Sequence, residues 1–179
     1  IAELVGGGKA LPIPPLLDFF GVPIVNTTMD EAVEWIAARA ANHPGAARHP
    51  SLSKEGNTSD LALGAGEKAL LAFVNPDCLN IAYTHDRYRT VLQQAARVLP
   101  DGIGVKIGCR MRSLGLAANV NGTDLFPRLC ERAARDEFSL FLLGARPGIA
   151  ELVAENMRAR YPKLIIAGTQ HGYFGPDEE

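Results

Sequence analysis

The stretch FSLFLLGARPGIAELVAENMRARYPKLIIA, residues 138–167, decides the fold class of this chain. It opens on an apolar run over 138–143, which predicts a buried strand, and a glycine-containing turn over 144–148 follows. Residues 149–160 are expected to form a helix, and the apolar run over 164–167 predicts a second strand. A strand, a helix and a strand in this order form a right-handed crossover between parallel strands.

The segments before this unit show the same alternation. Strands are expected at 22–25, 69–74 and 97–99, and helices at 29–41, 83–96, 103–116 and 124–135. The sequence Thr28-Met29-Asp30-Glu31 fits a capping box at the start of the first of these helices. Strands that alternate with helices predict an α/β protein with a Rossmann-like open, mainly parallel sheet and helices on both faces.

The chain is long enough for a single α/β domain, which we expect over residues 22–179. Residues 1–21 are rich in glycine and proline and are expected to form an irregular lead-in. Residues 43–67 have little periodicity and are expected to form a mobile surface insertion. The ending Gly175-Pro176-Asp177-Glu178-Glu179 resembles the start of a helix that is not continued, which predicts that the sequence is a fragment.

Composition excludes several classes of protein. The 179 residues hold 18 Lys and Arg against 20 Asp and Glu, a net charge of -2, which offers no electrostatic surface for nucleic acid. The sequence contains no run of about 18 apolar residues that could span a membrane, and no secretory signal is visible. Cys78, Cys109 and Cys130 form no CxxC pair, which favours reduced thiols in a cytoplasm. No cluster of His, Asp and Glu has the spacing of metal ligands, so no metal is expected.

Polar residues follow two of the expected strands. Asn75 and Asp77 come after 69–74, and Asp101 and Gly102 come after 97–99. In an open parallel sheet, ligands bind beyond the carboxyl ends of the strands. Either carboxylate could therefore act as a general base, or could simply cap the helix that follows it.

The turn over 144–148 allows two interpretations. Gly144 and Gly148 permit a tight turn, the helix start offers amides to a phosphate, and Arg146 adds a cation. The same glycines also suit a plain strand-to-helix turn. Neither this turn nor the glycine set over 102–108 matches a dinucleotide fingerprint or an ATP P-loop.

A polar and aromatic loop follows the last expected strand. In this loop, His171 could contact a phosphate and Tyr173 could stack on a base or sugar. The alternative is a loop that packs its aromatic side chains on the domain.

Taken in order, these motifs resemble the WecG/TagA/CpsF family of bacterial glycosyltransferases. The motifs are Asn75-Pro76-Asp77, Pro100-Asp101-Gly102-Ile103-Gly104, Asn121-Gly122-Thr123-Asp124, the run from Leu143 to Gly148, and Tyr161-Pro162 followed by His171-Gly172-Tyr173-Phe174. The resemblance covers residues 22–179 apart from 43–67. Each motif is weak alone, but five in this order are fairly specific.

The resemblance implies a metal-independent, inverting transferase. Such enzymes move a hexose or an N-acetylhexosamine, such as N-acetylmannosamine, from a UDP-sugar to a polyprenyl-diphosphate-linked sugar. They act in the synthesis of surface polysaccharide or teichoic acid, with the UDP-sugar as donor substrate and no further cofactor. The resemblance also implies peripheral attachment to the cytoplasmic face of the membrane through a C-terminal segment missing here. Assembly as a homo-oligomer stays open.

The resemblance assigns roles to particular residues of this chain. Asp101 takes the place of the catalytic base, and Asn75 and Asp77 lie beside the sugar pocket. Further substrate-binding residues are Gly102, Asn119, Asn121, Gly122 and Asp124. Residues assigned to the nucleotide or its diphosphate are Gly144, Arg146, Gly148, His171, Gly172 and Tyr173.

One residue departs from the family pattern. Asn119 stands where the family commonly has an arginine that is thought to help the leaving group, and asparagine supplies no charge. Either another cation such as Arg146 compensates, or the subgroup differs in substrate or activity. Asn119 thus keeps open a non-catalytic α/β interaction module, and a nucleotide-binding α/β oxidoreductase is a separate alternative.

Overall fold

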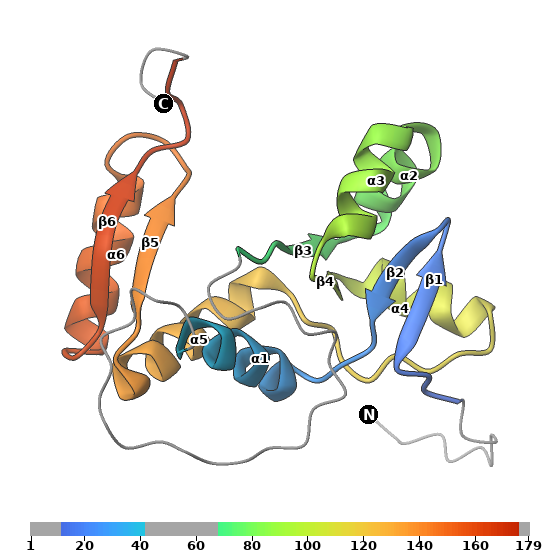
Figure 1. The fold of residues 1–179 in the computed structure, drawn as a ribbon, viewed down its shortest axis with the longest axis horizontal. Coiled ribbons are helices and arrows are strands. Elements are labelled where there is room, and N and C mark those ends of the chain that lie inside the picture. The colour runs from blue at the N-terminus through green and yellow to red at the C-terminus, as the bar shows by residue number, and fades with distance from the viewer. Residues whose placement is uncertain (1–11, 42–67, 176–179) are drawn as a thin grey trace, which may run out of the picture. The chain divides into compact units, whose positions relative to one another are not determined.

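The computed structural model describes residues 12–41 and 68–175, and the expected insertion over 43–67 lies outside them (Figure 1). The helices and strands are, in order, β1 Leu16–Phe19, β2 Val22–Val25, α1 Met29–Ala41, β3 Leu71–Val74, α2 Pro76–Thr84, α3 Asp86–Gln94, β4 Arg97–Pro100, α4 Ile103–Met111, α5 Gly122–Asp136, β5 Ser139–Leu143, α6 Ile149–Arg160 and β6 Ile165–Gln170.

The chain divides into two compact units. Unit 1 comprises Ile1–Ala32 and Ala69–Gly122, and unit 2 comprises Val33–Lys68 and Thr123–Glu179. The α/β class is confirmed, because β3 pairs with β4 and β5 with β6 in parallel. Hydrogen bonding groups the described strands into three two-stranded sheets, β1-β2, β3-β4 and β5-β6, rather than into one continuous sheet. A single domain over 22–179 stays a prediction.

Unit 1 begins with an antiparallel hairpin of β1 and β2, in which Phe19 pairs with Val22. Its two-residue turn has positive φ at Phe20 (58°) and Gly21 (79°), as a type I′ turn requires. The Gly21 amide also donates to Asp18 Oδ1 at 3.2 Å. The expectation of an irregular segment is therefore wrong for residues 16–19. The usual Asn-Gly signal of such a turn is replaced by Phe-Gly, which hides the hairpin in the sequence.

The helical part of unit 1 corrects a second prediction. A single helix over 83–96 is wrong, because α2 and α3 are separate helices with the extended residue His85 between them (φ −122°, ψ 98°). The first of them starts early because Asn75 caps it directly after β3. The helix expected over 103–116 ends at Met111, and Ser113 then has positive φ (56°).

The core of unit 1 joins the hairpin to the parallel pair. Its fully buried side chains include Val22, Ile24, Val74, Val98 and Val105. Leu79 of α2 and Leu92 of α3 are also buried in this cluster. The β3-β4 pair is thus held at a defined position within unit 1, and so are the loops at its carboxyl end.

Unit 2 contains the β-α-β arrangement predicted for residues 138–167, and this prediction is confirmed. The helix α6 lies along one face of the parallel β5-β6 pair (Figure 1). Cys130, Ala133, Ala154, Leu164 and Ile166 form the buried centre of this unit. Two boundaries differ from expectation, because β6 continues to Gln170 and α5 starts at Gly122.

The capping box at the start of α1 is confirmed. The Glu31 amide donates to Thr28 Oγ1 at 3.3 Å, and the Thr28 amide donates back to Glu31 Oε2 at 2.8 Å. The hydrogen bond from the Thr28 backbone lowers the pKa of Glu31. The charged form of this carboxylate therefore stabilises the helix start.

The three cysteines are free, and each lies in a helix. Cys109 and Cys130 are fully buried, whereas Cys78 is half-buried. Burial raises the pKa of Cys130 to about 11. These two buried thiols are therefore part of the packing and are poor nucleophiles.

Within residues 12–41 and 68–175, no helix combines the length and apolar character needed to cross a lipid bilayer.

Candidate active site

Three segments of unit 1 end side by side at the carboxyl end of its parallel strands. The Asp101 amide donates to the Val74 carbonyl oxygen at 2.9 Å, so the residue after β4 lies beside the end of β3. The Val120 amide donates to the Pro100 carbonyl oxygen, also at 2.9 Å. The loops that contain Asn75, Asp101 and Asn121 therefore lie at one edge, as predicted for Asn75 and Asp101.

Asp101 does not cap a helix. The N-cap of α4 is Gly102, with φ 93° and ψ 161°, so the capping interpretation of Asp101 is wrong. The Asp101 side chain is half-buried, and no residue within the described part of the chain forms a hydrogen bond or ion pair with its carboxylate. Backbone hydrogen bonds thus place Asp101 at the strand edge, and its carboxylate oxygens stay available to a ligand.

Asn119 acts on the backbone beside this carboxylate. Its Oδ1 accepts a hydrogen bond from the Gly102 amide at 2.5 Å, across 17 positions of sequence. An arginine could not make this contact, because a guanidinium has no hydrogen-bond acceptor. Asn119 therefore holds the Asp101-Gly102 connection, a role the sequence analysis did not foresee.

Asn75 and Asp77 have different local roles. Asn75 is the N-cap of α2, and its Oδ1 accepts from the Cys78 amide at 2.9 Å. Asp77 lies in the first turn of that helix, so the capping interpretation of Asp77 is also wrong. The cap fixes the Asn75 side chain at the edge and leaves its amide nitrogen as a donor.

Gly104 and Gly108 of α4 are packing residues. A Cβ added at Gly104 would lie 2.1 Å from Pro76 Cγ, and one at Gly108 would lie 3.1 Å from Phe19 Cε1. These glycines let α4 approach α2 and β1 closely. The glycine set after Asp101 therefore has a structural cause that requires no phosphate.

The turn after β5, in unit 2, is more open. Gly144, Ala145 and Gly148 have positive φ (140°, 61° and 86°), and a Cβ added at either glycine would meet nothing within 4 Å. Gly148 is the N-cap of α6, and no side chain caps the helix. Arg146 is exposed and forms no ion pair with other described residues. The Ile149 amide donates to the Arg146 carbonyl oxygen at 3.1 Å, so the turn offers an anion the remaining first-turn amides of α6 and the Arg146 cation.

The loop after β6 lies against this turn. The Gly172 amide donates to the Ala145 carbonyl oxygen at 2.9 Å, and a Cβ at Gly172 would lie 3.3 Å from Gly144 Cα. The Tyr173 amide donates to His171 Nδ1 at 3.2 Å, and Tyr173 is 70% exposed. The alternative in which Tyr173 packs on the domain is therefore wrong.

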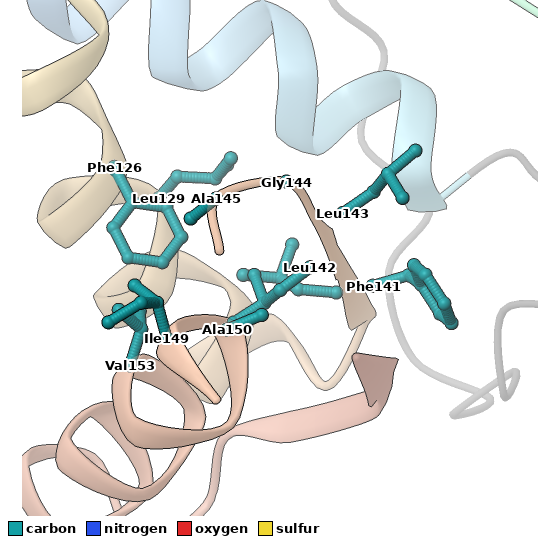
Figure 2. A pocket seen from close by; sticks show the side chains of 11 residues that line it. Phe126, Leu129, Phe141, Leu142, Leu143, Gly144, Ala145, Ile149, Ala150 and Val153 are labelled. Atoms are coloured by element: carbon teal, nitrogen blue, oxygen red, sulfur yellow. The ribbon is translucent and has the colours of Figure 1, made fainter. Parts of the chain in front are cut away.

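Unit 2 also has an open apolar pocket of about 440 Å³, which the sequence analysis missed. Figure 2 shows Phe126 and Leu129 of α5 near Ile149 and Val153 of α6. Gly144 and Ala145 form part of its lining, so the pocket adjoins the turn. Apolar side chains on α5 and α6 face each other only in the folded unit, so the pattern along the chain did not reveal it.

The predicted site residues fall into two groups, each described within its own unit. Unit 1 holds Asn75, Asp77, Asp101, Gly102, Asn119, Asn121 and Gly122. Unit 2 holds Asp124, Gly144, Arg146, Gly148, His171, Gly172 and Tyr173. Gly122 and Asp124 both lie in the first turn of α5.

No group of three or more His, Cys, Asp or Glu side chains that could hold a metal ion occurs in the described ranges. Metal independence stays a prediction.

The fold and these loops define an α/β protein with polar groups at the carboxyl ends of parallel strands. Among known families, the model described as "Glycosyl transferase WecG/TagA/CpsF family" matches residues 52–179. The chain belongs to this family.

Curated relatives are similar over nearly the whole chain. Proteins of Staphylococcus aureus strains NCTC 8325 / PS 47, COL and MRSA252 are each 28% identical to it over 163 residues. Each is named N-acetylglucosaminyldiphosphoundecaprenol N-acetyl-beta-D-mannosaminyltransferase. The match covers 91% of this chain and 56% of each relative, so the chain spans about half the length of the curated relatives it matches.

Proposed function

We propose that the chain acts as an inverting glycosyltransferase. In this proposal, it moves a hexose or N-acetylhexosamine, such as N-acetylmannosamine, from a UDP-sugar to a polyprenyl-diphosphate-linked sugar. Family membership and the names of the relatives support the transfer of a sugar to a lipid-linked acceptor. The UDP-sugar donor comes from the family resemblance alone.

The observation that carries the proposal is the Asp101 carboxylate. It lies at the carboxyl end of β4, half-buried, with no partner among the described side chains. Asn119 fixes the next backbone amide, and the Val74 carbonyl fixes that of Asp101 itself. A general base needs this combination of fixed position and free oxygen atoms.

The proposed step needs one proton acceptor. The Asp101 carboxylate takes the proton of the acceptor hydroxyl while that oxygen forms a bond to the anomeric carbon. The bond between the anomeric carbon and the phosphate oxygen breaks on the opposite face, and UDP leaves with the electron pair. The configuration at the anomeric carbon is inverted, and the proton ends on Asp101.

A separate role is proposed for unit 2. The start of α6, where no side chain caps the helix, and Arg146 are assigned to a diphosphate, because both stabilise negative charge. The Glu151 carboxylate, in the first turn of α6, would repel a diphosphate at this site. Its Oε1 accepts a hydrogen bond from Thr169 Oγ1 at 3.3 Å. Each role is proposed for its own unit and is tested there.

The remaining expectations belong to the same proposal. The transfer would take place at the cytoplasmic face of the membrane, in the synthesis of surface polysaccharide or teichoic acid. No cofactor besides the donor substrate is required. Membership of a glycosyltransferase family argues against the oxidoreductase alternative.

Calorimetric titration tests the donor. UDP, UDP-N-acetylmannosamine, UDP-N-acetylglucosamine and NAD are titrated separately into the chain, with and without magnesium. We expect selective binding of UDP and a UDP-sugar that does not depend on magnesium. Binding of NAD alone would overturn the proposal, and binding of none of the four would favour a non-catalytic interaction module.

A further inference from the structure

We propose that the exposed face of α4 is a docking surface for an anionic lipid bilayer. This face, here called the α4 face, consists of Ile103, Lys106, Ile107, Arg110 and Met111. The inference rests on the proposed function only in its link to catalysis, because the surface itself is a property of unit 1.

The apolar half of the α4 face is a continuous stripe. Ile103, Ile107 and Met111 are spaced by four residues, so they lie along one side of the helix. Their exposed fractions are 67%, 52% and 82%. Apolar side chains of this size are usually buried, and three in a row on one helix indicate a surface that meets an apolar phase.

The opposite side of α4 already has its packing partners. Val105 and Cys109 are buried in the core of unit 1, and Gly104 and Gly108 lie close to Pro76 and Phe19. The helix therefore cannot turn its apolar stripe inward without losing these contacts. The exposure of the stripe is a consequence of tight packing on the other side.

The charged half of the α4 face is entirely basic. Lys106 and Arg110 are also four residues apart, both are exposed, and neither forms an ion pair with another described residue. The helix contains no acidic residue. Arg112, just beyond it, is not counted, because its guanidinium donates to the Asp18 carbonyl and lies 5.2 Å from the centre of the Phe19 ring.

An apolar stripe beside a basic stripe matches the chemistry of one partner. A helix that lies in a membrane interface buries its apolar side among acyl chains and presents cations to anionic headgroups. A second copy of this chain would present the same two cations, which would repel each other. Charge complementarity therefore favours the bilayer.

The position of the α4 face gives it a consequence for the proposed reaction. Ile103 follows Asp101 by two residues, so docking would hold the proposed base at the membrane surface. A polyprenyl-diphosphate-linked acceptor has its sugar at that surface. This link, unlike the docking itself, depends on the proposed function.

Vesicle sedimentation tests the docking without donor or acceptor. The chain is mixed with vesicles of phosphatidylcholine alone, or with 30% phosphatidylglycerol, and the bound fraction gives a partition coefficient. We expect binding to the anionic vesicles. The charge variant Lys106→Gln/Arg110→Gln should bind about thirty-fold more weakly, the effect of two cations near an anionic surface. The apolar variant Ile107→Ser/Met111→Ser should also lose most of the binding.

A matched control lies on α3 of the same unit. Arg87 and Val91 are exposed and also four residues apart, so Arg87→Gln/Val91→Ser removes a cation and an apolar side chain elsewhere. This variant should bind like the unmodified chain. Circular dichroism and thermal unfolding of all variants would show whether each one is folded.

Each outcome decides the proposal. Loss of binding in both α4 variants, with binding retained in the α3 variant, supports it. No binding to anionic vesicles, or equal binding by all variants, overturns it. Self-association that only the α4 variants abolish, without vesicle binding, would assign the face to a second copy instead. If vesicle binding is seen but no UDP-sugar binds, the proposed function fails and the docking surface stands.

Discussion

The connections after β4 and β5 both lead from a parallel strand into a helix whose N-cap is a glycine with positive φ. The side chains that they carry have opposite charges, a carboxylate at Asp101 and a guanidinium at Arg146. After β4, two residues suffice, a carboxylate lies at the edge, and the Gly102 amide is taken by Asn119. After β5, five residues form an open turn with Arg146, and, as at α4, no side chain caps the helix that follows.

The difference shows that a glycine beside a helix start does not define a phosphate site. In α4, Gly104 is required by the approach of Pro76, whereas in the turn after β5 the space around Gly144 and Gly148 is open. The first connection is suited to accept a proton and the second to hold an anion. The predictions below test this contrast, from the largest expected effect to the smallest.

Replacing Asp101 tests the first connection most directly. Asp101→Asn should lower the rate of sugar transfer by about 10²- to 10⁴-fold, because the amide cannot take the proton of the acceptor hydroxyl. UDP affinity should be nearly unchanged. Transfer of a labelled sugar and titration of UDP measure the two effects.

Asp77→Asn provides the control, since Asp77 lies in the first turn of α2 at the same edge. It should lower the transfer rate far less than Asp101→Asn. Full activity of Asp101→Asn would show that the carboxylate is not the base and would remove the contrast between the two connections.

Adding a methyl group at Gly104 tests whether this glycine serves packing. In Gly104→Ala, the Cβ would meet Pro76 Cγ at 2.1 Å, so the free energy of unfolding should fall by about 1–3 kcal/mol. Denaturant unfolding measures this change. UDP affinity of the folded variant should not change.

Gly122→Ala is the matched control for Gly104. Its Cβ would lie 3.9 Å from Phe73 Cε2, an ordinary contact at the start of a helix, so stability should stay the same or rise slightly. A Gly104→Ala variant with an unchanged free energy of unfolding and weakened UDP binding would contradict the packing role.

Removing the cation of the second connection should have a smaller effect. Arg146→Ala should weaken UDP binding about tenfold, as expected for one charge-assisted hydrogen bond. Lys163→Ala, at the opposite end of β6, removes a cation away from the turn and should leave the affinity unchanged. If both variants bind UDP as the unmodified chain does, the turn is a plain strand-to-helix connection.

The capped start of α1 offers the smallest test, as the counterpart of the uncapped start of α6. Thr28→Ala should lower the free energy of unfolding by about 1 kcal/mol. The backbone hydrogen bond from Thr28 lowers the pKa of Glu31, so the contribution of this carboxylate is present above its ordinary pKa. It should be lost as the pH falls through the lowered pKa.

Glu31→Gln therefore provides the pH test. The difference in unfolding free energy between this variant and the unmodified chain should shrink as the solution becomes acidic. Unfolding curves at several pH values would show this. A difference that grows on acidification would contradict the capping role.

Local patterns predicted the parts of the fold that depend on neighbouring residues. The β-α-β unit and the capping box are both present, because apolar runs and the Thr28–Glu31 spacing act within a few residues. The hairpin of β1 and β2 was missed because its turn uses Phe20 at positive φ. The break between α2 and α3 was missed because the cap at Asn75 starts the first helix early.

The sequence by itself determined the α/β class, the order of the main elements and the polar residues at the strand ends. Only the tertiary structure decided what those residues contact. Asn119 meets Gly102 across 17 positions, Pro76 meets Gly104, and the Asp101 carboxylate is left without a partner among the described residues. The physical reason is that strand and helix patterns arise from adjacent residues, whereas these contacts exist only after distant segments have packed together.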